Sequence, residues 1–249
     1  MIPARYASSR LPGKPLVDLA GRSMIARVYA RVQSALPTAD IVVATDDERI
    51  ASHLREIDIP FAMTDPKHES GTDRVAEVAA LRGLADGDLV INVQGDEPLV
   101  PVDLLQAFLA YCQGKPELQM VTISAPVEDV EQLFNANVVK LVTDQAGIAL
   151  MFSRSTIPYC RDKPQSDWPL ADYQRHIGIY GYRVGALKRV VATPLCMLEQ
   201  MEKLEQLRAM WLGIRIGVLQ WSACPPHGVD TPADVERVTR LIQEMEQQA

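Results

Sequence analysis

Three cationic side chains stand in one short segment at the start of the sequence. "PARYASSRLPGK", residues 3–14, carries Arg5, Arg10 and Lys14 together with two serines, two prolines and a glycine. The segment follows the first apolar residues, where a first β-strand should end, and precedes a helical pattern that starts at Met24. A glycine-containing loop at such a place exposes backbone N–H groups that suit phosphate oxygens, and the cations add charge. The segment therefore favours a triphosphate-binding loop.

An ordinary surface loop is the alternative interpretation of this segment. Exposed loops carry charges, and Gly13 and the two prolines shape turns. The place of the cations behind a predicted strand favours the phosphate interpretation. The pattern is neither GxxxxGK[ST] nor GxGxxG, which disfavours P-loop kinases and dinucleotide-binding enzymes.

Two aspartates are candidate metal ligands. Asp96 lies in "QGDEP", directly after a predicted buried strand, and Asp230 lies in "GVDTPADVERV". Mg²⁺ takes oxygen ligands, usually one or two carboxylates with phosphates and water. Helix capping is the alternative for both residues. Thr231 and Pro232 already supply an N-cap and a first helical residue, so capping does not require Asp230, and Asp96 lies far upstream of a helix that begins near Pro101.

The composition limits the class of protein. The chain has 249 residues, 47% hydrophobic and 23% charged, which is typical of one large α/β domain or two small ones. Its net charge of -7 argues against nonspecific nucleic-acid binding. No stretch approaches the ~20 apolar residues of a membrane span, and no signal peptide is visible, so we expect a cytoplasmic protein. The 4 cysteines and 4 histidines lack ligand spacing, which disfavours zinc.

Strand and helix patterns alternate in the first half. "ADIVVATDD" and "DLVINVQGDEP" are apolar runs that end in polar residues, and they predict buried strands that lead into loops. Apolar residues at helical spacing predict helices around 24–32, 50–57 and 75–81, and Asp46 and Asp47 are the expected caps of the second. The alternation predicts a mostly parallel sheet covered by helices, with ligands beyond the carboxyl ends of the strands.

The pattern changes after Leu118. "LQMVTISAPV", "NVVKLVTDQAGIALMFSRS" and "HIGIYGYRV" predict antiparallel strands, the second with a turn near residues 144–147. "MEKLEQLRAMWL" predicts a helix, "IRIGVLQW" a strand and residues 233–247 a closing helix. Residues 161–172 indicate a mobile excursion. The fold class is therefore α/β with an antiparallel α+β elaboration in the second half.

One family contains these motifs in the same order. The matching segments are "IPARYASSRLPGKPL", "VATDDERI", "SGTDRVAEV", "VINVQGDEPL", "NVVKLV", "FSRSTIP", "RHIGIYGYR", "LEQMEKLEQLR" and "GVDTPADVERV". Over nearly its whole length the chain resembles the 3-deoxy-manno-octulosonate cytidylyltransferases, also called CMP-KDO synthetases. The resemblance implies a Rossmann-like nucleotidyltransferase fold, Mg²⁺ as cofactor, CTP and 3-deoxy-D-manno-octulosonate (KDO) as substrates, a role in lipopolysaccharide biosynthesis, and a homodimer.

The resemblance also implies the domain organisation. We expect a single nucleotidyltransferase domain over residues 1–249, in which residues 118–220 include the sugar-binding and dimerisation elaboration. Family members usually have several more apolar residues before "IPAR", whereas only Met1 stands before it in this sequence. A shortened first strand is therefore expected.

The family motifs assign roles around the nucleotide. Asp96 and Asp230 would hold Mg²⁺, and with Arg10 and Lys14 they form the expected catalytic set. The expected nucleotide contacts are Pro3, Ala4, Arg5, Ser8, Arg10, Lys14, Ser70, Gly71, Arg74, Gln94 and Asp96. "SGTDRVAEV" also fits a helix start, with Thr72 as N-cap and Asp73 in the first turn, and both interpretations can hold together.

A second set of motifs is assigned to the sugar acid. The expected contacts are Gln94, Arg154, His176, Tyr180, Glu205 and Gln206. A lone histidine on an apolar strand is more often structural, and His176 is singled out only because Arg175 and Tyr180 share its motif. Glu205 and Gln206 either line a pocket or face solvent beside the core leucines. In the implied reaction, the anomeric hydroxyl of KDO attacks the α-phosphorus of CTP without a covalent enzyme intermediate.

Two rival functions stay open. The first is the same chemistry on another acid, either 8-amino-KDO or a sialic acid, which turnover of a panel of sugar acids would separate. The second is a catalytically idle nucleotide-binding sensor or subunit. The presence of both aspartates and all three loop cations argues against the second.

Overall fold

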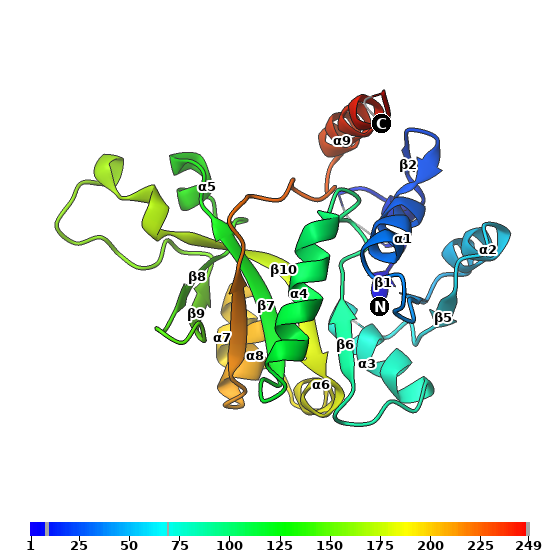
Figure 1. The fold of residues 1–249 in the computed structure, drawn as a ribbon, viewed down its shortest axis with the longest axis horizontal. Coiled ribbons are helices and arrows are strands. Elements are labelled where there is room, and N and C mark those ends of the chain that lie inside the picture. Colours follow the sequence, from blue (N-terminus) through cyan, green and yellow to red (C-terminus); the bar gives the residue numbers. More distant parts are fainter. Residues whose placement is uncertain (8–9, 69, 248–249) are drawn as a thin grey trace. The chain divides into compact units, whose positions relative to one another are not determined.

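The chain forms two compact units in the computed structural model, which describes residues 1–7, 10–68 and 70–247 (Figure 1). The first unit comprises residues 1–84, 92–107 and 225–249, and the second comprises residues 85–91 and 108–224. All residues predicted to contact the nucleotide or the metal belong to the first unit. The predicted sugar contacts belong to the second unit, apart from Gln94. The single-domain organisation stays a prediction.

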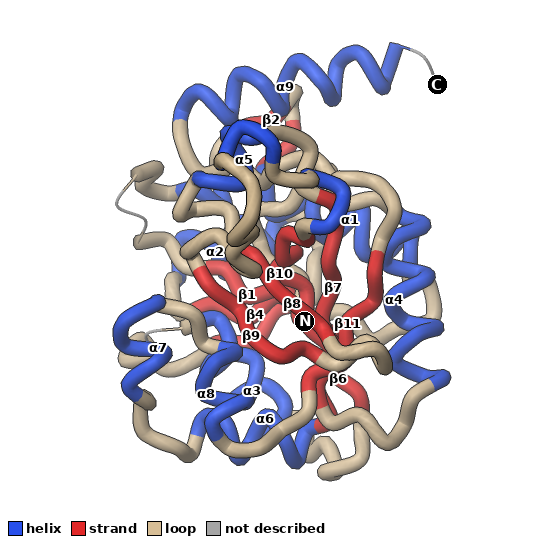
Figure 2. Tube along the Cα trace, turned by 90° about the vertical axis from the view of Figure 1, so that its left-hand side faces the viewer, coloured by secondary structure: helices blue, strands red, loops and turns tan. Residues whose placement is uncertain are grey.

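The first unit has a small parallel sheet with helices around it. Its elements are β1 (Ile2–Ala4), the 3₁₀ turn η1 (Lys14–Leu16), β2 (Asp18–Leu19), β3 (Arg22–Ser23), α1 (Met24–Ala35), β4 (Val43–Thr45), α2 (Glu48–Glu56), β5 (Phe61–Met63), α3 (Gly71–Leu81) and α9 (Pro232–Gln247). The sheet order is β1-β4-β5, and Figure 2 shows β1 beside β4. The register pairs Ile2 with Val43 and Val43 with Phe61. The predicted parallel sheet is confirmed for β1, β4 and β5, and its first strand is three residues long. The strand predicted in "DLVINVQGDEP" forms but pairs in the sheet of the second unit.

The helices of the first unit follow the predicted apolar spacing over most of their length. Met24, Ile25, Val28 and Val32 of α1 are all buried. Two predicted core positions at helix ends are exposed: Ile57 follows α2 with 40% exposure, and Leu81 ends α3 with 65%. At a helix end the next turn no longer covers the apolar stripe, so the pattern overestimates burial there.

The last helix, α9, closes the core of the first unit. Val238 and Ile242 pack in one buried cluster with Leu19 and Met24, and Figure 1 shows α9 beside β2. Burial of these aliphatic side chains is the main favourable term that holds the C-terminal helix in place. The predicted closing helix is confirmed.

The second unit has a mixed, mostly antiparallel sheet. Its elements are β6 (Leu89–Asn92), α4 (Val102–Gly114, which begins in the first unit), β7 (Met120–Pro126), α5 (Val130–Phe134), β8 (Lys140–Thr143), β9 (Ala149–Ser153), the 3₁₀ turns η2 (Gln165–Asp167) and η3 (Leu170–Asp172), β10 (Gln174–Arg183), α6 (Val184–Val191), α7 (Met197–Glu202), α8 (Gln206–Trp211) and β11 (Ile216–Gln220). The order is β11-β7-β10-β8-β9, with β6 also paired to β10. Figures 1 and 2 show the C-terminal part of α4 on one face of this sheet and α7 with α8 on the other.

Local structure in the second unit corrects one sequence prediction and adds detail to others. The single helix predicted in "MEKLEQLRAMWL" is two short helices, because Lys203 adopts a left-handed conformation with φ 53°. In β10, Ile179 and Tyr180 lie on opposite faces of the strand and are both buried, at 1% and 8% exposure. The excursion at residues 161–172 contains two 3₁₀ turns, and the buried Trp168 stacks on Tyr173 with ring centroids 5.9 Å apart.

No helix within the described ranges is both long enough and apolar enough to span a membrane.

A close backbone approach at Gly95 gives a test of the first unit. A Cβ at Gly95 would lie 2.7 Å from the carbonyl oxygen of Pro3, which cannot rotate away as a side chain can. Gly95→Ala should therefore lower the free energy of unfolding by about 1–3 kcal/mol, measured by urea denaturation. Gly87→Ala, where a Cβ would meet nothing within 4 Å, is the matched control. Equal stability of the two variants would contradict the close approach.

Candidate active site

The opening loop is shaped by an aromatic side chain that the sequence analysis did not single out. The Gly13 N–H donates to the Tyr6 carbonyl at 3.1 Å, and Gly13 has φ 68°. The Tyr6 ring lies against Gly13 on one side, and the Arg49 guanidinium lies 3.4 Å from its centroid. These contacts fold the loop back so that Lys14 begins η1. Ser8 lies outside the described residues.

Lys14 lies between the two predicted metal ligands. Its Nζ donates to Asp96 Oδ2 at 2.6 Å and to Asp230 Oδ1 at 2.8 Å. The other Asp230 oxygen lies 3.0 Å from Arg10 Nη2. The Lys14 side chain is only 13% exposed, whereas that of Arg10 is 60% exposed. The structure thus brings all four residues of the predicted catalytic set into one cluster.

The carboxylates keep Lys14 charged. Burial alone lowers a lysine pKa, because it removes water from the ammonium group. The two aspartates outweigh this effect through their charges and hydrogen bonds, so the pKa of Lys14 is raised above its ordinary value. Lys14 therefore carries a positive charge at neutral pH in spite of its burial.

Asp230 is positioned by the start of α9 and does not cap it. Thr231 Oγ1 accepts a hydrogen bond from the Asp234 N–H, and Asp234 Oδ2 accepts from the N–H groups of Asp230 and Thr231. Burial opposes the charge on Asp234, but hydrogen bonds from Arg237, Thr231 and the backbone lower its pKa to about 2. The predicted N-cap at Thr231 is confirmed, and the Asp230 side chain is left available for cations.

Backbone contacts set the separation of the two aspartates. The Val229 N–H donates to the Asp96 carbonyl at 2.9 Å, and a Cβ at Gly228 would lie 2.8 Å from that same oxygen. A larger residue at Gly228 would push the Asp230 segment away from Asp96. This tight packing holds two residues that are far apart in the sequence beside each other.

The two carboxylates fit a divalent cation. Oxygens from Asp96 and Asp230 converge on one positive centre, the Lys14 ammonium group, and Mg²⁺ is bound by one or two carboxylates with phosphates and water. Across the part of the chain that the structure describes, no three His, Cys, Asp or Glu side chains form a metal cluster. The remaining ligands of such a cation would therefore come from substrate and water.

Several residues predicted to surround the base meet at the end of β1. A Cβ at Gly71 would lie 3.1 Å from Pro3 Cγ and 3.7 Å from Gln94 Oε1, so these three residues are neighbours. Ala4 is buried at the end of the strand, and Arg5 is exposed just after it. The N-cap of α3 is Ser70, whose Oγ accepts from the Asp73 N–H at 3.1 Å. The prediction of Thr72 as N-cap is therefore wrong, because Gly71 already has helical geometry.

Arg74 is buried and links two loops through hydrogen bonds. Its guanidinium donates to Asp46 Oδ2 at 2.8 Å, to Thr64 Oγ1 at 2.9 Å and to the His68 carbonyl at 3.3 Å. Only Asp47 caps α2, through the Arg49 N–H, so the expected capping role of Asp46 is wrong. Arg74 thus positions the loops after β4 and β5.

In the second unit, His176 is a neutral hydrogen-bonding group. Its Nε2 lies 2.9 Å from Thr122 Oγ1, which also donates to the Ile179 carbonyl at 2.9 Å. Because the hydroxyl has one proton and gives it to a carbonyl, we assign the ring proton to Nε2 and leave Nδ1 as an acceptor. Burial lowers the pKa of His176 to about 3.

Tyr180 and Gln206 are also buried in the second unit. The His176 and Tyr180 ring centroids are 5.3 Å apart. Burial raises the pKa of Tyr180 well above its ordinary value, and the neighbouring Tyr182 and Glu205 add to the effect. Gln206 is 4% exposed, and its Nε2 has no hydrogen-bond partner among the described residues. Such a buried donor normally has a partner, which a ligand or water can supply.

Arg154 is held by backbone carbonyls. Its Nε donates to the Glu202 carbonyl at 2.6 Å and its Nη1 to the Ala136 carbonyl at 2.9 Å. The fully buried Lys140 donates to the carbonyls of Asn135, Val138 and Arg154, at 2.9, 2.6 and 2.9 Å. Lys140 is not among the predicted site residues, although a lysine inside the apolar run "NVVKLV" indicates a specific buried role.

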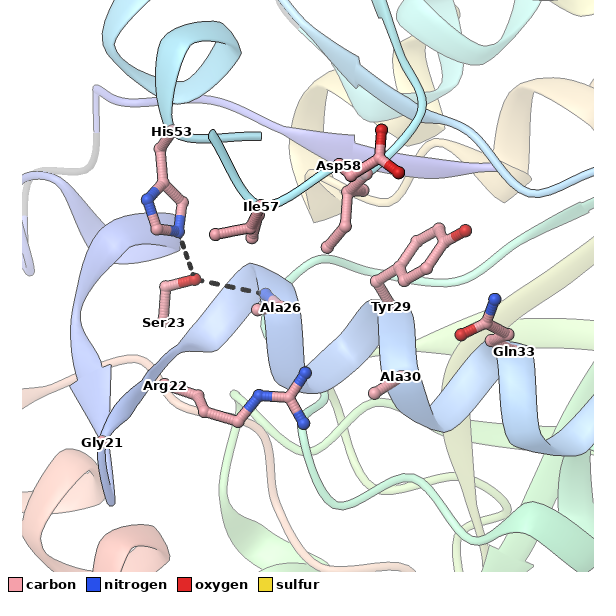
Figure 3. Close-up of a pocket in the computed structure, with 11 residues that line it drawn as sticks. Gly21, Arg22, Ser23, Ala26, Tyr29, Ala30, Gln33, His53, Ile57 and Asp58 are labelled. Atoms are coloured by element: carbon pink, nitrogen blue, oxygen red, sulfur yellow. Dashed lines mark hydrogen bonds between the residues drawn. The ribbon is translucent and has the colours of Figure 1, made fainter. Parts of the chain in front are cut away.

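A separate pocket of about 430 Å³ lies between α1 and the end of α2 in the first unit (Figure 3). Ser23, the N-cap of α1, lies 2.7 Å from His53 Nε2 at its edge. Arg22, Tyr29 and Asp58 also line this pocket. It contains none of the site residues predicted from the sequence.

Comparison with known proteins identifies close relatives. The family model described as "Cytidylyltransferase" matches residues 1–216. The chain is 56% identical to a 3-deoxy-manno-octulosonate cytidylyltransferase 2 of Paraburkholderia phytofirmans, over 97% of this chain and 92% of the relative. It is 49% identical to a 3-deoxy-manno-octulosonate cytidylyltransferase of Pseudomonas fluorescens, over 98% and 97%. A solved CMP:2-keto-3-deoxy-manno-octonic acid synthetase complexed with CTP has a TM-score of 0.89 and 40% identity, over 98% of this chain and 97% of that one.

The burial of His176 predicts a pH dependence of stability. Its pKa is about 3 in the folded chain against 6.5 for the ordinary group. Between these pH values the unfolded chain binds more protons, so the free energy of unfolding falls as pH falls, by up to about 1.4 kcal/mol per pH unit. Denaturant unfolding at pH 6.5 and 4.5 should show a smaller loss for His176→Asn than for wild type. His227→Asn is the exposed control. Equal losses in wild type and His176→Asn would contradict a buried neutral ring.

Proposed function

This chain belongs to the 3-deoxy-manno-octulosonate cytidylyltransferase family, and on that premise we propose that it transfers CMP from CTP to the anomeric hydroxyl of KDO and releases pyrophosphate. Members of this nucleotidyltransferase family typically depend on a metal ion. We propose Mg²⁺ as that ion, a cytoplasmic location, and supply of CMP-KDO to lipopolysaccharide biosynthesis.

One observation carries the proposal for the nucleotide site. Two cations of the opening loop, Arg10 and Lys14, contact the carboxylates of Asp96 and Asp230 within a single unit. A triphosphate with a divalent cation needs this combination of positive side chains and carboxylates. A solved relative at 40% identity carries CTP.

The proposed reaction needs positioning and charge neutralisation more than covalent chemistry. Arg5, Arg10 and Lys14 neutralise the triphosphate. Asp96 and Asp230 would hold Mg²⁺, which would supply positive charge at the reacting phosphate. The cytosine lies near Pro3, Gly71 and Gln94, where its exocyclic amine needs an acceptor such as a backbone carbonyl. Arg74 positions the surrounding loops through Asp46 and Thr64.

The buried polar groups of the second unit support a sugar site. His176 offers Nδ1 as an acceptor, and Gln206 has a buried NH₂ group without a partner among the described residues. Tyr180 keeps its proton and serves as a hydroxyl donor. A polyhydroxylated ligand matches such neutral donors and acceptors. Arg154 shapes the site through the backbone near Ala136 and Glu202, and Glu205 completes the proposed contacts within this unit.

Release of pyrophosphate tests this function directly. Purified chain with Mg²⁺ and CTP should release pyrophosphate when KDO is added, and less with 8-amino-KDO or a sialic acid. Asp96→Asn keeps the side-chain size and removes the charge, so it should lose at least ~10²–10³-fold in turnover while its far-UV circular dichroism is unchanged. Pyrophosphate release with a sialic acid and not with KDO would show that the sialic acid is the substrate. No pyrophosphate release with any of the acids would favour a catalytically idle nucleotide-binding protein.

We also propose a symmetric homodimer formed mainly by the elaboration after Leu118. Exposed apolar side chains of the second unit support it: Leu195, Met197 and Met201 are 49%, 56% and 75% exposed. Met197 and Met201 are one helical turn apart and share a face of α7. Exposed apolar side chains on one face are a common mark of a protein contact.

Light scattering at micromolar concentration should give twice the chain mass of 27.5 kDa. Met201→Lys should shift the population toward monomer, because it places a charge in the proposed contact. Met245→Lys, at a 47% exposed methionine of α9, is the matched control. A wild-type chain that is monomeric at this concentration would refute the dimer and leave the proposed reaction untouched.

A further inference from the structure

We propose that Lys14 and the divalent cation compete for the same two carboxylates, so that the metal enters the site together with the nucleotide and Lys14 moves from the carboxylates to the phosphates. The proposal rests on the metal role proposed above for Asp96 and Asp230. It adds a step of cation exchange that couples the binding of metal and CTP.

The geometry is the first support. Asp96 Oδ2 and Asp230 Oδ1 both lie within 2.8 Å of one nitrogen, the Nζ of Lys14. Mg²⁺ binds carboxylate oxygens at ~2.0–2.1 Å. An ion that contacted both oxygens at that distance would stand close to the space that the ammonium group fills. The ammonium group must therefore leave before both aspartates can bind the ion.

The charge balance is the second support. The two carboxylates face two cations, Lys14 and Arg10, so the cluster is neutral as it stands. A divalent cation that entered alone would leave a surplus of positive charge next to a side chain that is only 13% exposed, where charges interact more strongly than in water. The triphosphate of CTP brings negative charge that removes this surplus.

The position of Lys14 makes the exchange mechanically simple. Lysine has a flexible four-carbon stem and three rotatable donors, so its ammonium group can change partners without a change in the backbone. Its Cα is fixed at the start of η1, where the loop is held by Tyr6 and Gly13. Arg10 is 60% exposed and contacts Asp230, so it can follow the same path.

The exchange has a signature that a simpler role for Lys14 lacks. If Lys14 only bound phosphates, its removal would weaken the binding of CTP and leave the binding of metal to the nucleotide-free chain unchanged. If Lys14 only stabilised the fold, its removal would weaken the binding of both the metal and CTP. In the exchange, its removal strengthens the binding of metal alone and weakens the binding of CTP alone. The coupling is reciprocal, because it is a difference in binding free energy.

Calorimetric titrations of the full chain test this signature. Mg²⁺ alone and CTP in EDTA are titrated into wild type, Lys14→Met and Lys188→Met. Lys14→Met should bind Mg²⁺ alone at least ten-fold more tightly than wild type and metal-free CTP at least ten-fold more weakly. Lys188→Met removes an exposed lysine that pairs with Asp86 at 2.7 Å in the second unit, and both affinities should stay at wild-type values.

Further variants separate the possible failures. Mg²⁺ binding to Lys14→Met that is unchanged or weaker overturns the exchange, and so does a gain that persists in the double variant Asp96→Asn/Lys14→Met. Lys14→Gln repeats the test with a polar neutral side chain, and thermal unfolding verifies that each variant is folded. Pyrophosphate release from wild type is measured separately. Lys14→Met could show tighter Mg²⁺ binding and weaker CTP binding while the wild-type chain releases no pyrophosphate. That result would refute the proposed reaction and support the exchange.

Discussion

The ion pairs of Lys14 join the three segments that form the candidate site of the first unit. A mostly buried ammonium group is costly unless it is paired, and Lys14 meets this need with carboxylates from residues 82 and 216 positions away in the sequence. The end of β1, the segment after β6 and the approach to α9 must therefore come together at one point. The close backbone contacts at Gly95 and Gly228 are consequences of the same requirement, because any added side-chain atom there would separate the charges.

Within the described part of the second unit, Lys140, His176 and Tyr180 are buried without the carboxylate hydrogen bonds that Lys14 has. Lys140 is fully buried, and its hydrogen bonds to the residues that the structure describes go to three backbone carbonyls. His176 is kept neutral by burial, and Tyr180 keeps its proton. The second unit also buries an ion pair, in which Arg208 Nε lies 2.9 Å from Glu199 Oε2, so its neutral polar groups are those around His176 and Tyr180. The contrast matches the two proposed ligands, since a triphosphate needs strong opposite charge and a polyhydroxylated acid needs mainly donors and acceptors.

Local sequence patterns predicted those features that neighbouring residues determine. The parallel strands, the turn near residues 144–147 and the cap at Thr231 each depend on a few adjacent side chains. The patterns did not give the pairing of β6 with β10 or the break at Lys203, because both depend on packing against distant segments. The prediction of Thr72 as the N-cap of α3 was wrong for a local reason. Serine and threonine can both cap a helix, and the residue at which the helix begins determines which of them does. The convergence of Asp96, Asp230 and Lys14 lies beyond any local pattern.

Asp230 contacts both Arg10 and Lys14, and this explains how the two cations can lie close together before a phosphate binds. Arg10 and Lys14 would repel each other if they faced one point without a counter-charge. Asp230 presents one oxygen to each of them, and Asp96 takes a second donor of Lys14. The cations are thus held close to the place where a triphosphate would need them, at little cost in further ordering. Carboxylate partners stabilise the fold of the site and also hold the cations where phosphate oxygens can replace the carboxylates. Uncharged partners could stabilise the fold but would not balance the charge of the cations.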